Sequence, residues 1–163
     1  MRRFTARHLN KIDKKGRTSV PAAFRTIVES SGAPIIYLKP NEVEGCIDCL
    51  TEAFMAEVER RIDELDIGSE ERDDLEEEYF AESIAVRFDT EGRIVIPTDL
   101  KDLAEIDAEV VFVGKGSHFE IWEPGRHGAR RAERTERRAR RTLPKAPRSS
   151  AAVSDRPRME SAE

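Results

Sequence analysis

Cysteine and histidine are scarce in this chain of 163 residues, and their placement disfavours metal or redox chemistry. Cys46 and Cys49 form a lone Cys-x-x-Cys pair, whereas a structural zinc site needs about four ligands. The histidines are scattered along the chain, at His8, His118 and His127. A redox pair would need a βαβ setting, which the surrounding pattern lacks. We therefore expect no metal and no cofactor, and two buried, reduced thiols on a strand.

Long hydrophobic runs and catalytic motifs are also missing. Met1-Arg2-Arg3 leads into no apolar segment of the signal-peptide kind, and no run reaches the length of a membrane span. There is no nucleophile elbow, and Gly114-x-Gly116 is too short to count as a phosphate-binding loop. We expect a soluble cytoplasmic protein that is not an enzyme, with no membrane contact and no small-molecule substrate.

Charge is abundant but unevenly distributed. Charged residues make up 37% of the chain and hydrophobic residues 38%, and the formal net charge is −5. Residues 1–17 contain seven basic residues and one acidic residue. The stretch from Glu57 to Glu82 is rich in carboxylates, and the stretch from Arg126 to Arg148 has an excess of basic residues. Because a phosphate responds to the local field, the acidic total does not exclude a nucleic-acid partner.

The chain contains an internal repeat. Asp13-Lys-Lys-Gly-Arg-Thr-Ser-Val-Pro21 returns as Asp89-Thr-Glu-Gly-Arg-Ile-Val-Ile-Pro97, with Asp, Gly, Arg and Pro at the same spacing. Further residues correspond in the same order: Phe24 with Leu100, Ile35–Leu38 with Val110–Val113, Leu50 with Trp122, and Thr51 with Glu123. The repeat indicates a duplicated module.

Each copy has the pattern strand, loop, strand, short helix, strand, strand. Apolar residues alternate over 84–88, which predicts a half-buried strand. Gly16 and Gly92 supply the positive φ that a tight turn needs. Pro21 and Pro97 end the next strand and suit a first helical turn. The other expected elements are strands at 18–20, 93–96, 35–38 and 110–113 and helices at 22–29 and 98–104. The pattern predicts an α+β, β-rich fold.

Between the copies, two helices are expected over residues 54–82. Apolar residues recur there at helical spacing, and Gly68-Ser69 separates the two segments. The carboxylates of this connector are interpreted as a solvated face rather than a metal site. The domain boundaries that follow are module 1 at 1–53, the helical connector at 54–82, and module 2 at 83–124.

Residues 125–163 are expected to be a basic, disordered tail, because they offer no apolar face to bury. The pairs Glu133–Arg137 and Glu136–Arg140 could support a transient helix. The tail either contacts phosphates without sequence preference or is an inert extension, and the sequence leaves both open. Trp122, just before the tail, is interpreted as a core residue rather than a platform for stacking bases.

The repeated loops are the best candidates for function. A tight turn brings Asp13 to Arg17 and Asp89 to Arg93, so that each carboxylate can hold a guanidinium in place. A held arginine can donate two hydrogen bonds to guanine, which discriminates by about 1–3 kcal/mol. The alternative is a purely structural salt bridge across a turn, but a turn does not require arginine at that place twice.

The two loops differ in charge. Lys14 and Lys15 flank the first loop and could bind phosphates, whereas the second has Thr90 and Glu91, and Glu91 would repel phosphate. Counted from Asp to Arg, the formal charge is +2 in the first loop and −1 in the second. We therefore predict that the first loop supplies more of the affinity for DNA.

The motifs resemble those of the MraZ family, whose modules belong to the AbrB-like (SpoVT-AbrB) group. The resemblance covers about residues 1 to 124 and rests on these motifs: Asp13-Lys-Lys-Gly-Arg17 with Pro21 and Phe24-Arg25, Cys49-Leu-Thr-Glu-Ala-Phe54, Asp89-x-x-Gly-Arg93 with Ile96-Pro97, Val113-Gly-Lys-Gly116, and Phe119-Glu-Ile-Trp122.

The resemblance implies two tandem swapped-hairpin, double-split β-barrel modules that assemble into rings. It also implies a regulator, mostly a repressor, of a division and cell-wall gene cluster that includes its own gene, bound to repeated promoter boxes in the nucleoid. The DNA-contacting residues would be Asp13 and Arg17 with Asp89 and Arg93. Two other functions stay open: an AbrB-like interaction module such as an antitoxin that uses its tail, and a ring scaffold that does not read sequence.

Overall fold

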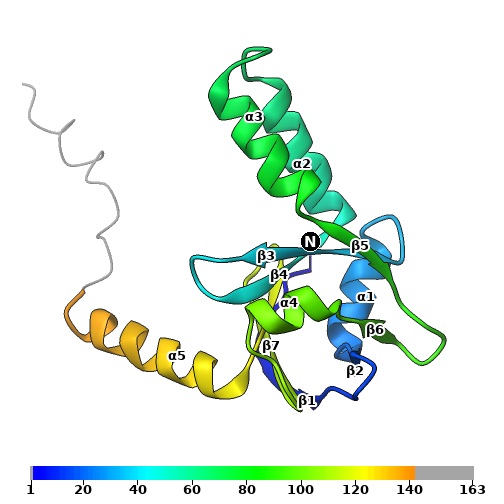
Figure 1. Ribbon diagram of the computed structural model, residues 1–163, viewed down its shortest axis with the longest axis vertical. Helices are drawn as coiled ribbons and strands as arrows, with labels where there is room; N and C mark the ends of the chain where they lie inside the picture. Colours follow the sequence, from blue (N-terminus) through cyan, green and yellow to red (C-terminus); the bar gives the residue numbers. More distant parts are fainter. Residues whose placement is uncertain (1, 142–163) are drawn as a thin grey trace, which may run out of the picture. The chain divides into compact units, whose positions relative to one another are not determined.

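The computed structural model describes residues 2–141 of the chain (Figure 1). It divides into two compact units, Met1–Ala129 and Arg130–Glu163. The part of the expected tail from 142 to 163 lies outside the described residues. Within residues 2–141, no helix is both long enough and apolar enough to cross a membrane.

The order of elements follows the repeat. The first half contains β1 (Arg7–Lys11), β2 (Arg17–Ser19), α1 (Ala22–Ser30), β3 (Ile35–Asn41) and β4 (Cys46–Thr51). The connector contains α2 (Glu52–Asp63), α3 (Glu70–Glu76) and a π-helical turn η1 (Glu77–Ala81). The second half contains β5 (Ile84–Arg87), β6 (Arg93–Val95), α4 (Thr98–Leu103), β7 (Glu109–Gly114), β8 (Phe119–Trp122) and α5 (Pro124–Ala139). The predicted strands, short helices and connector helices are confirmed to within a few residues.

The two halves exchange strands. A six-stranded antiparallel sheet has the order β1-β7-β8-β4-β3-β5, and β2 and β6 form a separate two-stranded ribbon. Thus β1 of the first half pairs with β7 of the second, and β5 of the second pairs with β3 of the first. Over residues 2–141 the sheet is open, with β1 and β5 at its edges, so the closed barrel implied by the resemblance is not formed there.

The strand register shows an approximate two-fold relation between the halves. Asp48 lies opposite Glu120, its equivalent in the repeat, and Thr18 lies opposite Ile94, its own equivalent. Residues that face their own repeat partner must lie close to the two-fold axis. The axis therefore passes between β4 and β8 and between β2 and β6.

One alignment made from the sequence is wrong by a residue. In the first pair of strands, Leu9 of β1 lies opposite Val111 of β7. The repeat equivalent of Leu9 is Ala85 of β5, and Ala85 lies opposite Tyr37 of β3. Tyr37 is thus the equivalent of Val111, and the fully buried Ile36 and Leu38 correspond to Val110 and Phe112. Residues 35–38 and 110–113 are all apolar, so their sequence pattern could not distinguish the inward from the outward positions.

Both halves contribute to a single core. Phe24 of α1 is 1% exposed, and its ring centroid lies 5.2 Å from that of Phe4 and 4.9 Å from that of Phe119. Leu100 of α4, the repeat equivalent of Phe24, is 4% exposed in the same cluster. Pro21 and Pro97 stand at the N-caps of α1 and α4, one residue ahead of the first turn to which they were assigned.

The predictions for the cysteines and the tryptophan are confirmed. Cys46 and Cys49 are fully buried on β4, and no disulfide joins them. Because they are three residues apart on a strand, their side chains point to opposite faces of the sheet. Burial raises the pKa of the Cys49 thiol well above its usual value, which favours the neutral form. Trp122 is fully buried.

The prediction of disorder from residue 125 is wrong for the part that forms α5. Glu123 accepts hydrogen bonds from the backbone N–H groups of Gly125 and Arg126, at 3.0 and 2.7 Å, and so caps this helix. His127 is 5% exposed, its ring lies 5.4 Å from that of Trp122, and its Nε2 accepts a hydrogen bond from Arg7 Nε at 3.1 Å. The start of α5 is therefore anchored by capping and by one buried side chain.

A signal for α5 was present in the repeat. Thr51 accepts a hydrogen bond from the backbone N–H of Phe54 and caps α2. Glu123 occupies the place of Thr51 in the second half, so α5 is the repeat equivalent of α2. The correspondence of Thr51 with Glu123 indicated a helix start that the lack of apolar residues obscured.

Candidate functional site

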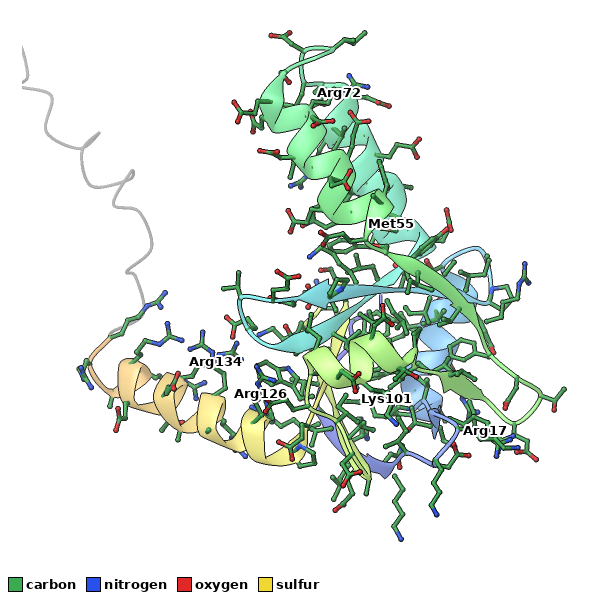
Figure 2. The ribbon with its side chains drawn as sticks, viewed as in Figure 1. Arg17, Met55, Arg72, Lys101, Arg126 and Arg134 are labelled. Atoms are coloured by element: carbon green, nitrogen blue, oxygen red, sulfur yellow. The ribbon has the colours of Figure 1, made fainter. Side chains whose placement is uncertain are left out.

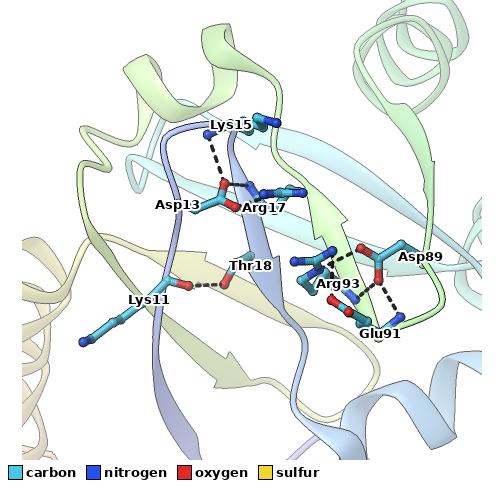
Figure 3. A network of polar contacts seen from close by, with 8 residues as sticks. All are labelled: Lys11, Asp13, Lys15, Arg17, Thr18, Asp89, Glu91 and Arg93. Atoms are coloured by element: carbon cyan, nitrogen blue, oxygen red, sulfur yellow. Dashed lines mark hydrogen bonds and ion pairs between the residues drawn. The ribbon is translucent and has the colours of Figure 1, made fainter.

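The first loop is a tight turn organised by one carboxylate. Asp13 Oδ1 accepts hydrogen bonds from the backbone N–H groups of Lys15 and Arg17, at 3.0 and 2.9 Å. Asp13 Oδ2 accepts a hydrogen bond from Arg17 Nε at 2.7 Å. Gly16 adopts a φ of +83°, as the turn requires. One side chain thus sets both the backbone of the loop and the direction of the guanidinium (Figure 3).

The second loop repeats this geometry. Asp89 Oδ1 accepts from the backbone N–H groups of Glu91 and Arg93, both at 2.9 Å, and Asp89 Oδ2 accepts from Arg93 Nε at 2.8 Å. Gly92 has a φ of +75°. The Asp–Arg pairs predicted from the sequence are therefore present in both halves.

The clamps lower the pKa of both carboxyl groups. For Asp13 the largest cause is the backbone N–H of Arg17, and for Asp89 it is the backbone N–H of Arg93. The hydrogen bond that the Arg93 side chain donates to Asp89 in turn raises the pKa of Arg93. Both carboxyl groups therefore stay ionised at neutral pH.

The two loops lie on one ribbon. In the β2–β6 pair, Arg17 faces Val95 and Ser19 faces Arg93. Residues directly opposite in an antiparallel pair point to the same side, so both arginines project from the same face. Thr18 and Ile94, between them, point the other way and are each 1% exposed. The outward face carries Arg17 and Arg93, with side chains 35% and 30% exposed.

Backbone hydrogen bonds tie each loop to the opposite half. Ile96 N–H donates to the carbonyl oxygen of Gly16 at 2.8 Å, and Val20 N–H donates to that of Gly92 at 3.2 Å. These bonds are related by the approximate two-fold relation. The two loops are consequently fixed to each other and present two guanidinium groups from one rigid surface.

Two contacts distinguish the second loop, and the sequence did not reveal either. Glu91 Oε2 lies 2.9 Å from Arg93 Nη2, so Arg93 is held by two carboxylates where Arg17 is held by one. Arg25 of α1 packs against Gly92 and donates to the carbonyl oxygen of Glu91 at 3.4 Å. Arg25 is distant in sequence, and only the strand exchange brings it to this loop.

The remaining site residues lie where expected. Lys14 and Lys15 are exposed beside Asp13 in the first loop. Pro21 and Pro97 end the ribbon strands, one on each side. All of the predicted loop residues are thus brought together at the β2–β6 ribbon.

A buried polar cluster lies elsewhere, at the contact of β4 with β8. Side-chain atoms of Cys46, Asp48 and Glu120 lie within 4.8 Å of one another. Asn41 Nδ2 lies 3.3 Å from each Asp48 carboxylate oxygen, and Trp122 Nε1 donates to Glu120 at 3.0 Å. Burial raises the pKa of Asp48. Protein donors satisfy these carboxylates, which explains how they are tolerated inside the sheet.

By class, this is a duplicated β-rich protein in which two acid-clamped arginines share one face of a ribbon. The model for the family described as "MraZ protein, putative antitoxin-like" matches residues 79–142. The chain is 45% identical to the "Transcriptional regulator MraZ" of Parvibaculum lavamentivorans, over 82% of this chain and 83% of that protein. The chain belongs to the MraZ family.

Other relatives carry the same name. The "Transcriptional regulator MraZ" of Gluconacetobacter diazotrophicus is 37% identical over 86% of this chain and 91% of that protein. The protein of that name from Gluconobacter oxydans is 36% identical over 95% of this chain and 96% of that protein. These relatives confirm the family expected from the motifs.

Proposed function

We propose that this protein is a transcriptional regulator that binds promoter DNA through the paired loops of the β2–β6 ribbon. The observation that carries the proposal is the placement of Arg17 and Arg93 on one exposed face, each aligned by its own carboxylate. A fixed guanidinium loses little freedom on binding, and its free N–H groups match the O6 and N7 acceptors of guanine. Lys14 and Lys15 then add contacts to phosphates.

The relatives named as transcriptional regulators support this function, which is not an enzymatic one. We propose that the protein acts in the cytoplasm at the nucleoid, as a repressor of its own division and cell-wall gene cluster. The exchange of strands between the halves supports a swapped-hairpin arrangement, in which each β-loop-β hairpin is completed by the other half.

We further propose that copies of the chain form a ring on DNA. Subunits related by rotation around a ring point the same way, so neighbours would read direct repeats rather than palindromes. A single loop pair binds weakly, and linked copies gain through effective concentration. Mutating one of several promoter boxes should therefore weaken binding by more than its share. Full occupancy of an isolated box in a footprint would contradict the ring.

The loop test compares Arg17→Ala with Arg93→Ala in gel shifts on the upstream region of the gene. Arg93 has two carboxylate partners and Arg17 has one, so Arg17→Ala should cause the larger loss. We expect the loss from Arg17→Ala to fall within about 1–3 kcal/mol, as for a bidentate guanine contact. An equal or larger loss from Arg93→Ala would contradict the larger contribution of the first loop. Full binding by both variants would contradict the proposal that these loops bind DNA.

A gain of affinity should accompany the release of Arg93. Glu91→Gln removes the second carboxylate from Arg93 Nη2 and takes one negative charge from the DNA-facing loop. We expect tighter binding and a steeper dependence on salt. Glu59→Gln, an exposed substitution of equal charge on α2, is the matched control and should leave the affinity unchanged. Unchanged binding by Glu91→Gln would place the second loop away from DNA.

A second function, an antitoxin-like interaction module, is favoured by the description of the matching family model. Deletion of residues 125–163 separates the two. A DNA-binding regulator keeps its preference for promoter DNA over unrelated DNA without this segment, although its affinity falls with the loss of α5, whereas an antitoxin loses its partner. The repeat of the arginine loops favours the regulator.

A further inference from the structure

The helices that follow the two halves carry opposite charge. The connector, residues 52–82 with α2 and α3, contains fourteen carboxylates and three arginines, a formal charge of −11. Residues 124–141, with α5, contain eight arginines and two glutamates, a formal charge of +6. Figure 2 shows carboxylate oxygens along α2 and α3 and guanidinium nitrogens along α5. Two structurally equivalent positions of the repeat thus differ in the sign of their charge.

On α5 the arginines share one face. The arginine face consists of Arg130, Arg131, Arg134, Arg137 and Arg138. Their spacing of three and four residues places them on one side of a helix, over roughly 12 Å at 1.5 Å per residue. Arg131, Arg137 and Arg138 are exposed and form no ion pair with any residue between 2 and 141.

On the connector, four carboxylates share one helix face at the same spacing of three and four residues. The acidic face consists of Glu70, Asp73, Asp74 and Glu77, at positions i, i+3, i+4 and i+7. All four are exposed, and no cation from the described part of the chain lies within ion-pair distance of any of them.

Helix stability explains only part of this face. Carboxylates in the first turn of α3 interact well with the positive end of the helix dipole. Asp74 and Glu77 lie beyond the first turn of α3, where the dipole no longer stabilises negative charge. The helix dipole therefore does not explain these two carboxylates, whereas a cation on another surface would stabilise them.

We propose that the arginine face of α5 docks on the acidic face of α3 and η1 in a second copy of the chain. The two faces match in charge, in helical spacing and in length. Each copy carries one arginine face and one acidic face, so the contact joins two different surfaces. A row of joined copies therefore has an unoccupied arginine face at one end and an unoccupied acidic face at the other. Such head-to-tail contacts generate a ring when the rotation closes. This inference rests on the ring within the proposed function and names the surfaces that hold it.

The acidic face favours protein over DNA as the partner of α5. A connector with a charge of −11 repels phosphates, and every assembled copy brings that charge to the complex. Pairing it with α5 of a neighbour, a segment of charge +6, reduces the repulsion between connectors. The experiment described next distinguishes a second copy of the chain from DNA as the partner of α5.

The experiment reverses each face separately in the full-length chain. Variant A carries Arg134→Glu, Arg137→Glu and Arg138→Glu, and variant B carries Asp73→Lys, Asp74→Lys and Glu77→Lys. Asp99→Lys, Asp102→Lys and Asp107→Lys form the control, with the same charge change as variant B at exposed positions off the connector. Circular dichroism checks the folding of each, and sedimentation without DNA gives the assembly mass.

We expect each of variants A and B to associate about tenfold or more weakly than wild type at about 0.1 M salt, where the screening length is about 10 Å. The control should assemble as wild type does. An equimolar mixture of variants A and B should recover assembly, because the acidic face created on one complements the basic face of the other. Wild-type assembly should weaken at about 1 M salt, where that length falls to about 3 Å.

Three outcomes would overturn the inference. Wild-type assembly by both variants would show that other surfaces join the copies. Recovery in a single chain carrying both sets of changes, but not in the mixture, would place the contact within one chain. Wild-type assembly by variant A with loss of DNA binding would make DNA the partner of α5. Because mass is measured without DNA, failure of the loops to bind DNA would leave this result intact.

Discussion

Asp13 and Asp89 organise the two loops at the scale of single residues. Each accepts two backbone N–H groups and one guanidinium N–H, so each sets a turn and aims an arginine at once. Because the partners lie within four residues, the arrangement is determined by local chain geometry. This is why the sequence alone predicted both pairs.

The pKa values of these carboxyl groups can be tested directly by a carbon NMR titration. Both are lowered in the folded protein, so their contribution to stability is complete above the unfolded-state pKa of about 3.9 and is lost as pH falls through the folded values. In Arg17→Ala, the Asp13 pKa should stay below normal, because the largest cause is the backbone N–H of residue 17, which alanine keeps. A return to the unperturbed value would assign the shift to the guanidinium instead.

Glycine substitutions separate backbone strain from steric contact. Gly68 has a φ of +80°, and nothing lies within 4 Å of an added Cβ. Gly68→Ala should therefore lower the free energy of unfolding only through the strain of a left-handed backbone, by about 1–2 kcal/mol. In Gly16→Ala the Cβ would lie 2.7 Å from the carbonyl oxygen of Ile96, in addition to the strain at φ +83°. Urea unfolding should therefore rank Gly16→Ala as clearly more destabilising.

Gly92→Ala should lower the free energy of unfolding by an amount between those of Gly68→Ala and Gly16→Ala. The new methyl group would meet the end of the Arg25 side chain, which can move, rather than backbone. An equal loss of unfolding free energy in all three variants would mean that strain alone decides the cost.

At the scale of elements, helix starts are the most local features of this fold. Thr51 starts α2, Ser69 starts α3, and Glu123 starts α5, each by accepting backbone N–H groups. These caps replace the missing partners of the first turn. They let helices as polar as α3 and α5 begin at defined residues although neither has an apolar stripe.

The cap of α2 gives a prediction for stability. Thr51→Ala removes the oxygen that accepts from Phe54 N–H and should lower the free energy of unfolding by about 1 kcal/mol. Thr51→Ser keeps that oxygen and should lose much less. The midpoints of urea unfolding measure both, and equal losses would assign the effect to the buried methyl group instead of the cap.

At the scale of the whole molecule, neither half is complete alone. β1 and β2 find their partners in β7 and β6 of the other half, and β5 finds its partner in β3. The core likewise draws side chains from both halves. The duplication therefore produces one cooperative unit rather than two independent modules.

Separating the halves tests this dependence. A fragment of residues 1–82 should be unfolded, or should fold only as a dimer in which a second copy replaces the missing half. Mixing it with residues 83–163 should restore the native fold, seen by circular dichroism and by NMR of the fully buried Trp122. A folded monomer of residues 1–82 would show that strand exchange is dispensable.

The sequence by itself determined what depends on neighbours along the chain: the repeat, the glycine turns, the Asp–Arg pairs and the helix starts. Only the tertiary structure decided the exchange of strands, the register of β3 and β7, and the contact of Arg25 with the second loop. It also decided the meeting of Asp48 with Glu120. These features join residues far apart in sequence, and their free energy comes from pairing and burial that exist only once both halves have come together.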